Sequence, residues 1–225
     1  MIRLTSLAAL PAFLIGALAA APASAERYRI DLIVFADKSG VGAEAPLAVQ
    51  APDLKGAIEP YEVQQLRAAG IELLPDELFG LLEAWNHLRN SKNHQPLLRL
   101  AWYQKDPPTD RTVSLHLRYG AAFSPLVPGA TASEQKIYPL DGSVALIVGR
   151  YLHLDVDLVY TQVTEGGDLG SYRLHERRRL RRDELHHLDS PRIGLLVRAQ
   201  KADVTPPPAP KPKPAPKAPP QKKKK

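Results

Sequence analysis

An arginine-rich segment in the C-terminal part of the chain holds the residues best suited to binding chemistry. Residues 177–189 contain five arginines, together with acids and a histidine that could assist them: Arg177, Arg178, Arg179, Arg181, Arg182, Glu184, His186 and Asp189. Guanidinium groups form paired hydrogen bonds with carboxylates and phosphates. The segment therefore predicts a surface that binds an anionic ligand.

An extended conformation over residues 172–180 would collect these cations on one side. Side chains alternate along a strand, so Tyr172, Leu174 and Leu180 would share one face. The other face would carry positive charge, from Arg173, His175, Arg177, Arg179 and Arg181. A helix would instead spread the arginines around its whole circumference. We therefore expect a strand with an outward row of cations.

The same cluster also fits a purely structural role. Glu184 and Asp189 could each accept bidentate hydrogen bonds from neighbouring arginines and hold them in place. Ion-pair networks of this kind can specify packing without contacting any ligand. The sequence leaves both hypotheses open, the ligand-binding surface and the internal network.

Catalytic chemistry finds little support. Glu184, His186 and Asp189 could form an acid–base cluster for glycan cleavage, but the sequence offers no second carboxylate in a recognisable setting. The sequence also has no Gly-x-Ser-x-Gly elbow, no phosphate-binding glycine loop and no His-Glu-x-x-His motif. We therefore expect a protein that is not an enzyme, with no catalytic residues and no cofactor.

Metal binding is also disfavoured. His153, Asp155 and Asp157 alternate along an apolar segment and would share one strand face, where they could hold a cation. The sequence suggests no further ligand, so the solvated face of an amphipathic strand is the favoured interpretation. The adjacent His186 and His187 would point to opposite sides of a strand. We therefore expect no metal site.

Residues 177–197 also resemble the C-terminal signature of CsiV-type proteins. That signature combines an arginine pair, a further arginine, Glu-Leu-His, Leu-Asp and a proline before an apolar strand. The matching positions are Arg178, Arg179, Arg182 or Arg181, Glu184, Leu185, His186, Asp189 and Pro191. The chain departs from the pattern at His187, where the family often has Tyr, and at Ser190, where it often has His. Further similar stretches lie at residues 28–35, 96–104 and 149–154.

CsiV-type proteins are bacterial periplasmic proteins that bind peptidoglycan and support cell shape. The resemblance implies a non-catalytic accessory role beside a peptidoglycan synthase or its outer-membrane lipoprotein activator. Stem peptides of peptidoglycan carry carboxylates that suit arginines, and its sugars offer faces on which Trp102 or Tyr151 could stack. The rival hypothesis is an envelope assembly factor that binds another protein through a sheet edge or the C-terminal segment.

Residues 1–25 have the pattern of a secretory signal peptide. Arg3 precedes an apolar stretch over residues 4–18, and Ala23-Ser24-Ala25 forms a small-x-small cleavage site. The apolar stretch is shorter than the roughly 20 residues of a membrane span. We expect an exported, periplasmic chain that begins at Glu26 and has no membrane span after cleavage.

Charge divides the rest of the chain into a domain and a tail. Residues 26–200 hold 21 Lys and Arg against 23 Asp and Glu, whereas residues 201–225 hold eight lysines and one aspartate. The net charge of +6 therefore comes from the tail, and a near-neutral domain gives no reason to expect nucleic-acid binding. The proline- and lysine-rich tail has no apolar period and is expected to be disordered. The chain has no cysteine, so the single domain must fold without disulfides.

The hydrophobic pattern of residues 26–200 predicts an α+β domain with a largely antiparallel sheet. Residues 28–35 become apolar on both faces, as in a central strand. A short helix is expected over residues 61–69, ended by Gly70. The main helix should follow Pro75 and cover one face of the sheet with an apolar stripe of Leu78, Leu81, Leu82, Trp85 and Leu88.

Alternating segments predict the remaining strands. Residues 97–104 and 111–119 should form a hairpin across a short turn. Residues 144–160 should form one long strand with a bend or bulge near Gly149, because an unbroken strand of that length is unusual. Residues 193–199 should form the last strand, after the arginine-rich one.

Overall fold

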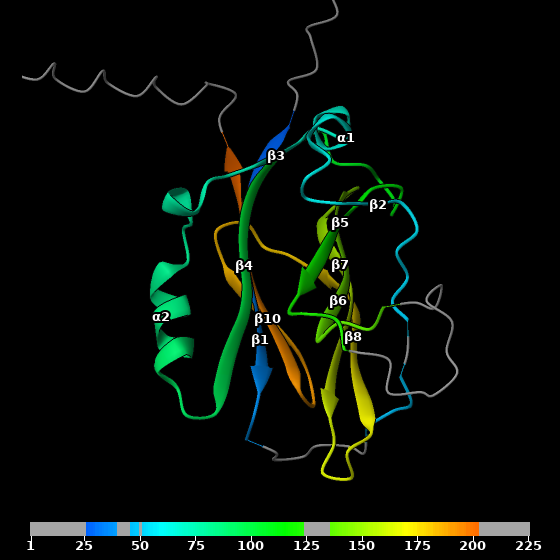
Figure 1. Ribbon diagram of the computed structural model, residues 1–225. Helices are drawn as coiled ribbons and strands as arrows, with labels where there is room; N and C mark the ends of the chain where they lie inside the picture. The colour runs from blue at the N-terminus through cyan, green and yellow to red at the C-terminus, as the bar shows by residue number, and fades with distance from the viewer. Residues whose placement is uncertain (1–25, 40–45, 50, 124–135, 203–225) are drawn as a thin grey trace, which may run out of the picture.

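In the described part of the chain, two five-stranded sheets pack face to face around a shared apolar core (Figure 1). The computed structural model describes residues 26–39, 46–49, 51–123 and 136–202. The first sheet has the order β3 (Ile71–Leu73), β4 (His94–Lys105), β1 (Arg27–Asp37), β10 (Ile193–Ala202) and β9 (Leu185–Ser190). The second has the order β2 (Ala57–Ile58), β5 (Ser114–Tyr119), β6 (Leu140–Val148), β7 (Leu152–Val163) and β8 (Leu169–Arg179). Neighbouring strands are antiparallel except β2 and β5, which are parallel.

The expected signal peptide, residues 1–25, and the expected tail beyond Ala202 lie outside the described residues. β10 continues to Ala202, two residues past the expected end of the domain. There it pairs with the start of β1, where Arg27 lies opposite Ala202. The two ends of the described domain therefore meet at one end of the first sheet.

β1 lies in the middle of the first sheet, and its side chains are buried on both faces, as predicted. Ile30, Leu32 and Val34 belong to the core between the sheets, which both sheets supply with aliphatic side chains. Ile33, on the opposite face of the strand, belongs to a second apolar cluster outside the first sheet. In a strand buried on both faces, most side chains contact other apolar groups and not water, which explains the apolar run in the sequence.

Helix α2 (Leu82–Asn90) covers the outer face of the first sheet, as expected for the main helix (Figure 1). Trp85 and Leu88 pack against Ile33 and Ala101 there. The expected start just after Pro75 is wrong, because residues 76–78 form a separate 3-10 turn, η1 (Asp76–Leu78). Leu78 and Leu82 are also not part of the buried stripe, since both are 51% exposed.

A buried carboxylate explains the break between η1 and α2. Asp31 is fully buried on β1 and accepts a hydrogen bond from the Gly80 backbone N–H at 2.6 Å. Arg29 donates to the same carboxylate at 3.0 Å, and Arg198 donates to the Gly80 carbonyl at 2.9 Å. A β-carbon at Gly80 would lie 2.8 Å from both Asp31 and Arg198 side-chain atoms. Gly80 is therefore held between η1 and the helix, and a larger residue there would push the ends of the Asp31 and Arg198 side chains aside.

The short helix α1 (Val63–Ala68) forms where it was expected. Gly70 follows it with a φ of +73°, a left-handed conformation that glycine adopts without steric cost. Gly70 also accepts a hydrogen bond from the Lys105 backbone N–H at 2.8 Å. The stop signal in the sequence thus marks a real helix end.

The long strand expected over residues 144–160 is instead the hairpin of β6 and β7. The chain reverses at residues 149–151, and Val148 pairs with Leu152. Residues paired across a hairpin lie on the same face, so the even-numbered apolar residues stay together through the reversal. The sequence pattern of one strand and that of this hairpin are consequently the same.

The hairpin expected from residues 97–104 and 111–119 does not form. β4 lies in the first sheet and β5 in the second, so the chain crosses between sheets at residues 106–113. The prediction of mostly antiparallel strands with few helices is confirmed, whereas the prediction of a single sheet is wrong. The fold is a two-sheet sandwich with α2 packed on the outside of one sheet.

Candidate anion-binding site

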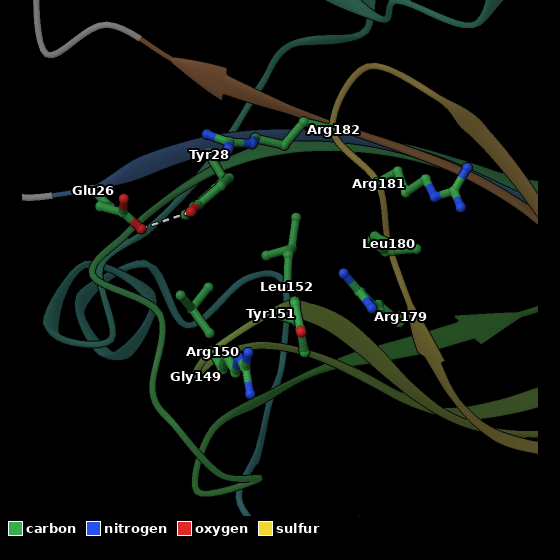
Figure 2. Close-up of a pocket in the computed structure, with 11 residues that line it drawn as sticks. Glu26, Tyr28, Gly149, Arg150, Tyr151, Leu152, Arg179, Leu180, Arg181 and Arg182 are labelled. Carbon is green, nitrogen blue, oxygen red and sulfur yellow. Dashed lines mark hydrogen bonds between the residues drawn. The ribbon is translucent and has the colours of Figure 1, made fainter.

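A polar pocket of about 400 Å³ opens at the end of the sandwich where the first and last strands of the described domain, β1 and β10, begin and end. Figure 2 shows side chains from three chain segments around it. The β6–β7 turn, the β8–β9 turn and the start of β1 supply its lining: Glu26, Tyr28, Val148, Gly149, Arg150, Tyr151, Leu152, Arg179, Leu180, Arg181 and Arg182. We call this the arginine pocket, because four of these residues are arginines.

Backbone hydrogen bonds hold the three segments in place. The Leu180 N–H donates to the Leu152 carbonyl at 2.8 Å and so joins the two turns. The Asp183 N–H donates to the Ala199 carbonyl at 2.9 Å and ties the β8–β9 turn to the first sheet. The Asp106 N–H donates to the Glu26 carbonyl at 2.7 Å. The pocket is thus built on the ends of paired strands.

The arginines of the pocket are short of negative partners. Within the described residues, no carboxylate lies within 4.0 Å of the guanidinium groups of Arg150, Arg179 or Arg182. Arg179 instead lies over the ring of Tyr151, with its Cζ 3.4 Å from the ring centroid, and Arg150 lies 5.4 Å from the same centroid. The pocket therefore carries a surplus of positive charge.

Glu26 is the one carboxylate in the lining, and it is already engaged. It accepts hydrogen bonds from the Tyr28 hydroxyl at 2.6 Å and from Lys201 at 3.2 Å. These bonds, with that from Tyr28 the larger effect, lower the pKa of Glu26. Burial and the bond to Glu26 raise the pKa of Tyr28 to about 12. Glu26 is therefore ionised and offsets only a fraction of the pocket's charge.

Arg181, Glu184 and His186 shape the β8–β9 turn. Arg181 Nη1 lies 3.7 Å from Glu184 Oε1, and both side chains are mostly exposed. The Arg181 backbone N–H donates to His186 Nε2 at 2.9 Å. His186 thus fixes the backbone that carries Arg181 and Arg182, and does not line the pocket itself.

Arg177, Arg178 and Asp189 lie outside the pocket. Arg177 binds Asp155 across the β7–β8 pair, with Nε to Oδ2 at 2.7 Å. Arg178 pairs with Glu176 at 2.8 Å. Asp189 is exposed on β9 and makes no ion pair with any described residue. The expected bidentate anchoring of arginines by Glu184 and Asp189 is therefore not found in the described structure.

The row of cations expected on β8 is partly neutralised by buried aspartates. Arg173 donates twice to Asp157, at 2.7 and 2.6 Å, and the Asp53 backbone N–H adds a bond at 3.2 Å. Asp155 accepts bonds from both Arg111, at 2.5 Å, and Arg177. We call these residues the outer-face network.

The solvated face expected around His153, Asp155 and Asp157 is therefore wrong. Asp155 and Asp157 are buried under arginines, 6% and 2% exposed. His153 turns away and places Nδ1 3.1 Å from the Tyr151 carbonyl oxygen. Across the described ranges, no cluster of three or more histidine and acidic side chains could hold a metal ion. The aspartates of β7 serve to neutralise arginines.

A comparison with models of protein families identifies the family of this chain. The family model described as "Peptidoglycan-binding protein, CsiV" matches residues 6–202. The chain belongs to the CsiV family. No curated protein sequence matches it, and no solved structure does. Among the described residues, no helix is long and apolar enough to cross a membrane.

The arginine pocket joins the CsiV signature to residues that sequence reasoning missed. Arg179, Arg181 and Arg182 belong to the signature, whereas Arg150, Glu26 and Tyr28 lie far away in the sequence. Arg150 carried a signal, since it interrupts the alternation of residues 144–160. Tyr151, proposed as a stacking residue, lines the pocket and is 38% exposed, but Trp102 is 1% exposed and lies in the core. Trp102 therefore cannot stack on a ligand.

Proposed function

We propose that this chain is a non-catalytic, periplasmic peptidoglycan-binding protein whose ligand contacts the arginine pocket. The carrying observation is a pocket with three guanidinium groups that have no carboxylate partner among the described residues, in a member of the CsiV family. Peptidoglycan is an anionic polymer with carboxylates along its stem peptides. Arginine side chains bind such groups through paired, charge-assisted hydrogen bonds.

The proposal extends to the setting of the protein. The pattern of residues 1–25 supports export to the periplasm, with the chain then beginning at Glu26. The family resemblance supports an accessory role in cell-wall synthesis and cell shape, beside a peptidoglycan synthase or its lipoprotein activator. Among the described residues, the pocket offers only one carboxylate, Glu26, already bonded to Tyr28 and Lys201. Most glycoside hydrolases use a pair of carboxyl groups, so a binding role is favoured.

Sedimentation with purified sacculi tests the proposal. The wild-type protein should co-sediment, and the double variant Arg150→Gln/Arg182→Gln should bind about tenfold more weakly, because it loses charge-assisted contacts. A matched double variant, Arg67→Gln/Arg89→Gln, removes the same charge from exposed helix positions outside the pocket. It should bind like wild type. Equal binding by the pocket variant and the wild type would contradict the proposal, as would release of soluble muropeptides.

A second candidate function is protein binding at an open edge of the sandwich. β3 pairs with β4 only at residues 102–104, so the edge of β4 that faces away from β1 has no paired strand among the described residues at Leu98 and Leu100. These two leucines line an apolar pocket of about 390 Å³ with Tyr61 and Leu117, and Tyr61 is 76% exposed. An envelope partner could add a strand at such an edge. A Leu98→Asp variant that still binds sacculi but loses its envelope cross-links would support this second role.

A further inference from the structure

We infer that the arginine pocket recognises a free peptide carboxylate of the stem peptide and not the sugars of the glycan strand. This inference rests on the proposed function and names the part of the polymer that is bound. It follows from which donors, acceptors and aromatic faces the pocket offers.

The donors of the pocket suit a carboxylate. Arg150 and Arg179 come from the β6–β7 turn and the end of β8, and Arg182 comes from the next turn, so the charges approach from different sides (Figure 2). None of the three has a carboxylate partner among the residues that the structure describes. A ligand carboxylate would supply the missing charge and could accept two parallel N–H bonds from one guanidinium.

The pocket lacks what a sugar needs. Sugar rings commonly pack on an open aromatic face, through the same face that cations contact. One face of the Tyr151 ring is already covered by Arg179, whose Cζ lies 3.4 Å from the ring centroid. The other aromatic residue of the pocket, Tyr28, is 4% exposed and bonds Glu26. Among the described lining residues, little aromatic surface is therefore left for a sugar ring beyond the uncovered part of Tyr151.

Acceptors for sugar hydroxyls are equally scarce. The carboxylate of Glu26 is occupied by the Tyr28 hydroxyl and by Lys201. The other polar side chains of the described lining are four arginines, which donate hydrogen bonds and accept none, and the hydroxyls of Tyr28, which bonds Glu26, and Tyr151. A group that only accepts, such as a carboxylate, matches this lining better than a hydroxyl group, which also has to donate.

Pocket size limits how much of the polymer enters. A volume of about 400 Å³ lies at the low end of the range for small-molecule pockets, ~300–1,000 Å³. A short peptide end fits this volume, whereas a glycan strand would have to pass over the surface. The ligand is therefore the carboxylate-bearing end or side chain of one stem peptide.

Competition in the sacculus assay tests the inference with the full-length protein. Released stem peptides with free carboxylates should displace it from sacculi. The same peptides with amidated carboxylates, and glycan strands stripped of peptides by an amidase, should displace it at least tenfold less well. Inorganic phosphate at matched concentration should also be at least tenfold weaker.

Each outcome has a distinct meaning. Displacement by stripped glycan or by amidated peptide as strong as by the free peptide would overturn the inference and leave peptidoglycan binding intact. Equal displacement by phosphate would overturn carboxylate recognition in favour of any anion. Absence of sacculus binding by the wild type would instead defeat the proposed function itself. Calorimetry of the free peptide adds a direct readout, with Arg182→Gln expected to weaken binding about tenfold and Arg89→Gln to leave it unchanged.

Discussion

Arginines of the same sheet fall into two groups with opposite surroundings. In the outer-face network, Arg173 and Arg177 cover buried Asp157 and Asp155. In the arginine pocket, Arg179 lies against Tyr151 and has no described carboxylate partner. Arg177 and Arg179 are two residues apart and extend from the same face of β8. Density of arginines in a sequence therefore does not distinguish a structural network from a binding site.

The residues across the strand pair make the difference. Arg177 lies opposite Asp155 on β7, whereas Arg179 lies opposite His153. His153 is held near the Tyr151 carbonyl at 3.1 Å and carries no fixed negative charge. Arg179 therefore has no negatively charged residue directly across the strand pair. A change from aspartate to histidine on β7 marks the border between the two groups.

The largest effect should come from removing a buried aspartate of the outer-face network. Asp157→Ala leaves Arg173 and the Asp53 N–H without their acceptor, and should lower the free energy of unfolding by about 3 kcal/mol. Asp189→Ala is the matched control, because Asp189 is exposed and pairs with no described residue. It should change stability by less than about 0.5 kcal/mol. Urea unfolding of both variants makes the measurement, and equal losses would contradict the comparison.

Single glutamine substitutions at Arg177 and Arg179 sharpen the comparison further. Arg179→Gln should weaken sacculus binding several-fold, on the order of 1 kcal/mol, because it removes a pocket cation. Arg177→Gln should leave sacculus binding unchanged, because that guanidinium is held by Asp155 outside the pocket. Sedimentation beside a melting curve separates the two effects. A loss of binding in Arg177→Gln with an intact fold would place the ligand on the outer-face network.

Stability should depend on pH in two opposite ways on the outer face of the second sheet. Burial would raise the pKa of Asp157, but hydrogen bonds from Arg173 and Asp53 outweigh it and lower the pKa. Burial would lower the pKa of His116, but hydrogen bonds from its ring to Asp141 and Glu59, at 2.6 and 2.7 Å, outweigh it and raise the pKa. Folding therefore favours the deprotonated, negatively charged form of Asp157 and the protonated, positively charged form of His116.

The directions of these two pKa shifts define a pH range in which both groups stabilise the fold. The contribution of Asp157 is present above its unfolded pKa of about 3.9 and is lost as pH falls through the lower folded value. The contribution of His116 is full below about pH 6.5 and is lost as pH rises through the higher folded value. Melting temperatures from pH 3 to 9 should peak between these limits. His116→Gln should remove the decline on the alkaline side, and an unchanged decline would contradict the assignment.

Removing residues 205–225 should have the smallest effect on the fold. The segment has no apolar period in its sequence and is not expected to contribute to a core. The melting temperature should therefore shift by less than about 5 °C, the size of a ~1 kcal/mol effect in a domain of this class. Sacculus binding should weaken only at low salt, since the lost lysines act by screened attraction. A larger thermal shift would mean that the tail docks on the domain.

Local patterns predicted those parts of the fold that local physics decides. The apolar run of β1 follows from burial on both faces, and the end of α1 follows from the left-handed φ of Gly70. The β6–β7 reversal was missed because an odd number of turn residues keeps Val148 and Leu152 on the same face. The crossing from β4 to β5 was missed because the sequence of a turn that joins two strands of one sheet looks like that of a turn that joins strands of two different sheets.

The binding site was predictable only in part for a related reason. Arg179, Arg181 and Arg182 lie close together in the sequence and were found by type and spacing. Arg150 reaches them because β7 pairs with β8, and Glu26 reaches them because the first sheet packs on the second. Strand register decides that Arg177 lies opposite Asp155, which neutralises it, and that Arg179 lies opposite His153. Apart from the break that Arg150 makes in the alternation of residues 144–160, these relations leave no local trace in the sequence.

The pairing of Arg27 with Ala202 bears on avidity. Both ends of the described domain lie beside the pocket, which Glu26 and Tyr28 line. The lysines that follow Ala202 in the sequence are covalently joined to the domain at this end, so any contact they make with the same polymer is intramolecular. Such a contact acts at an effective concentration set by the tether, and can slow escape from a repeating ligand without any new affinity in the pocket. A fusion tag at either end would crowd the same entrance, so labels for binding assays belong on the far end of the sandwich.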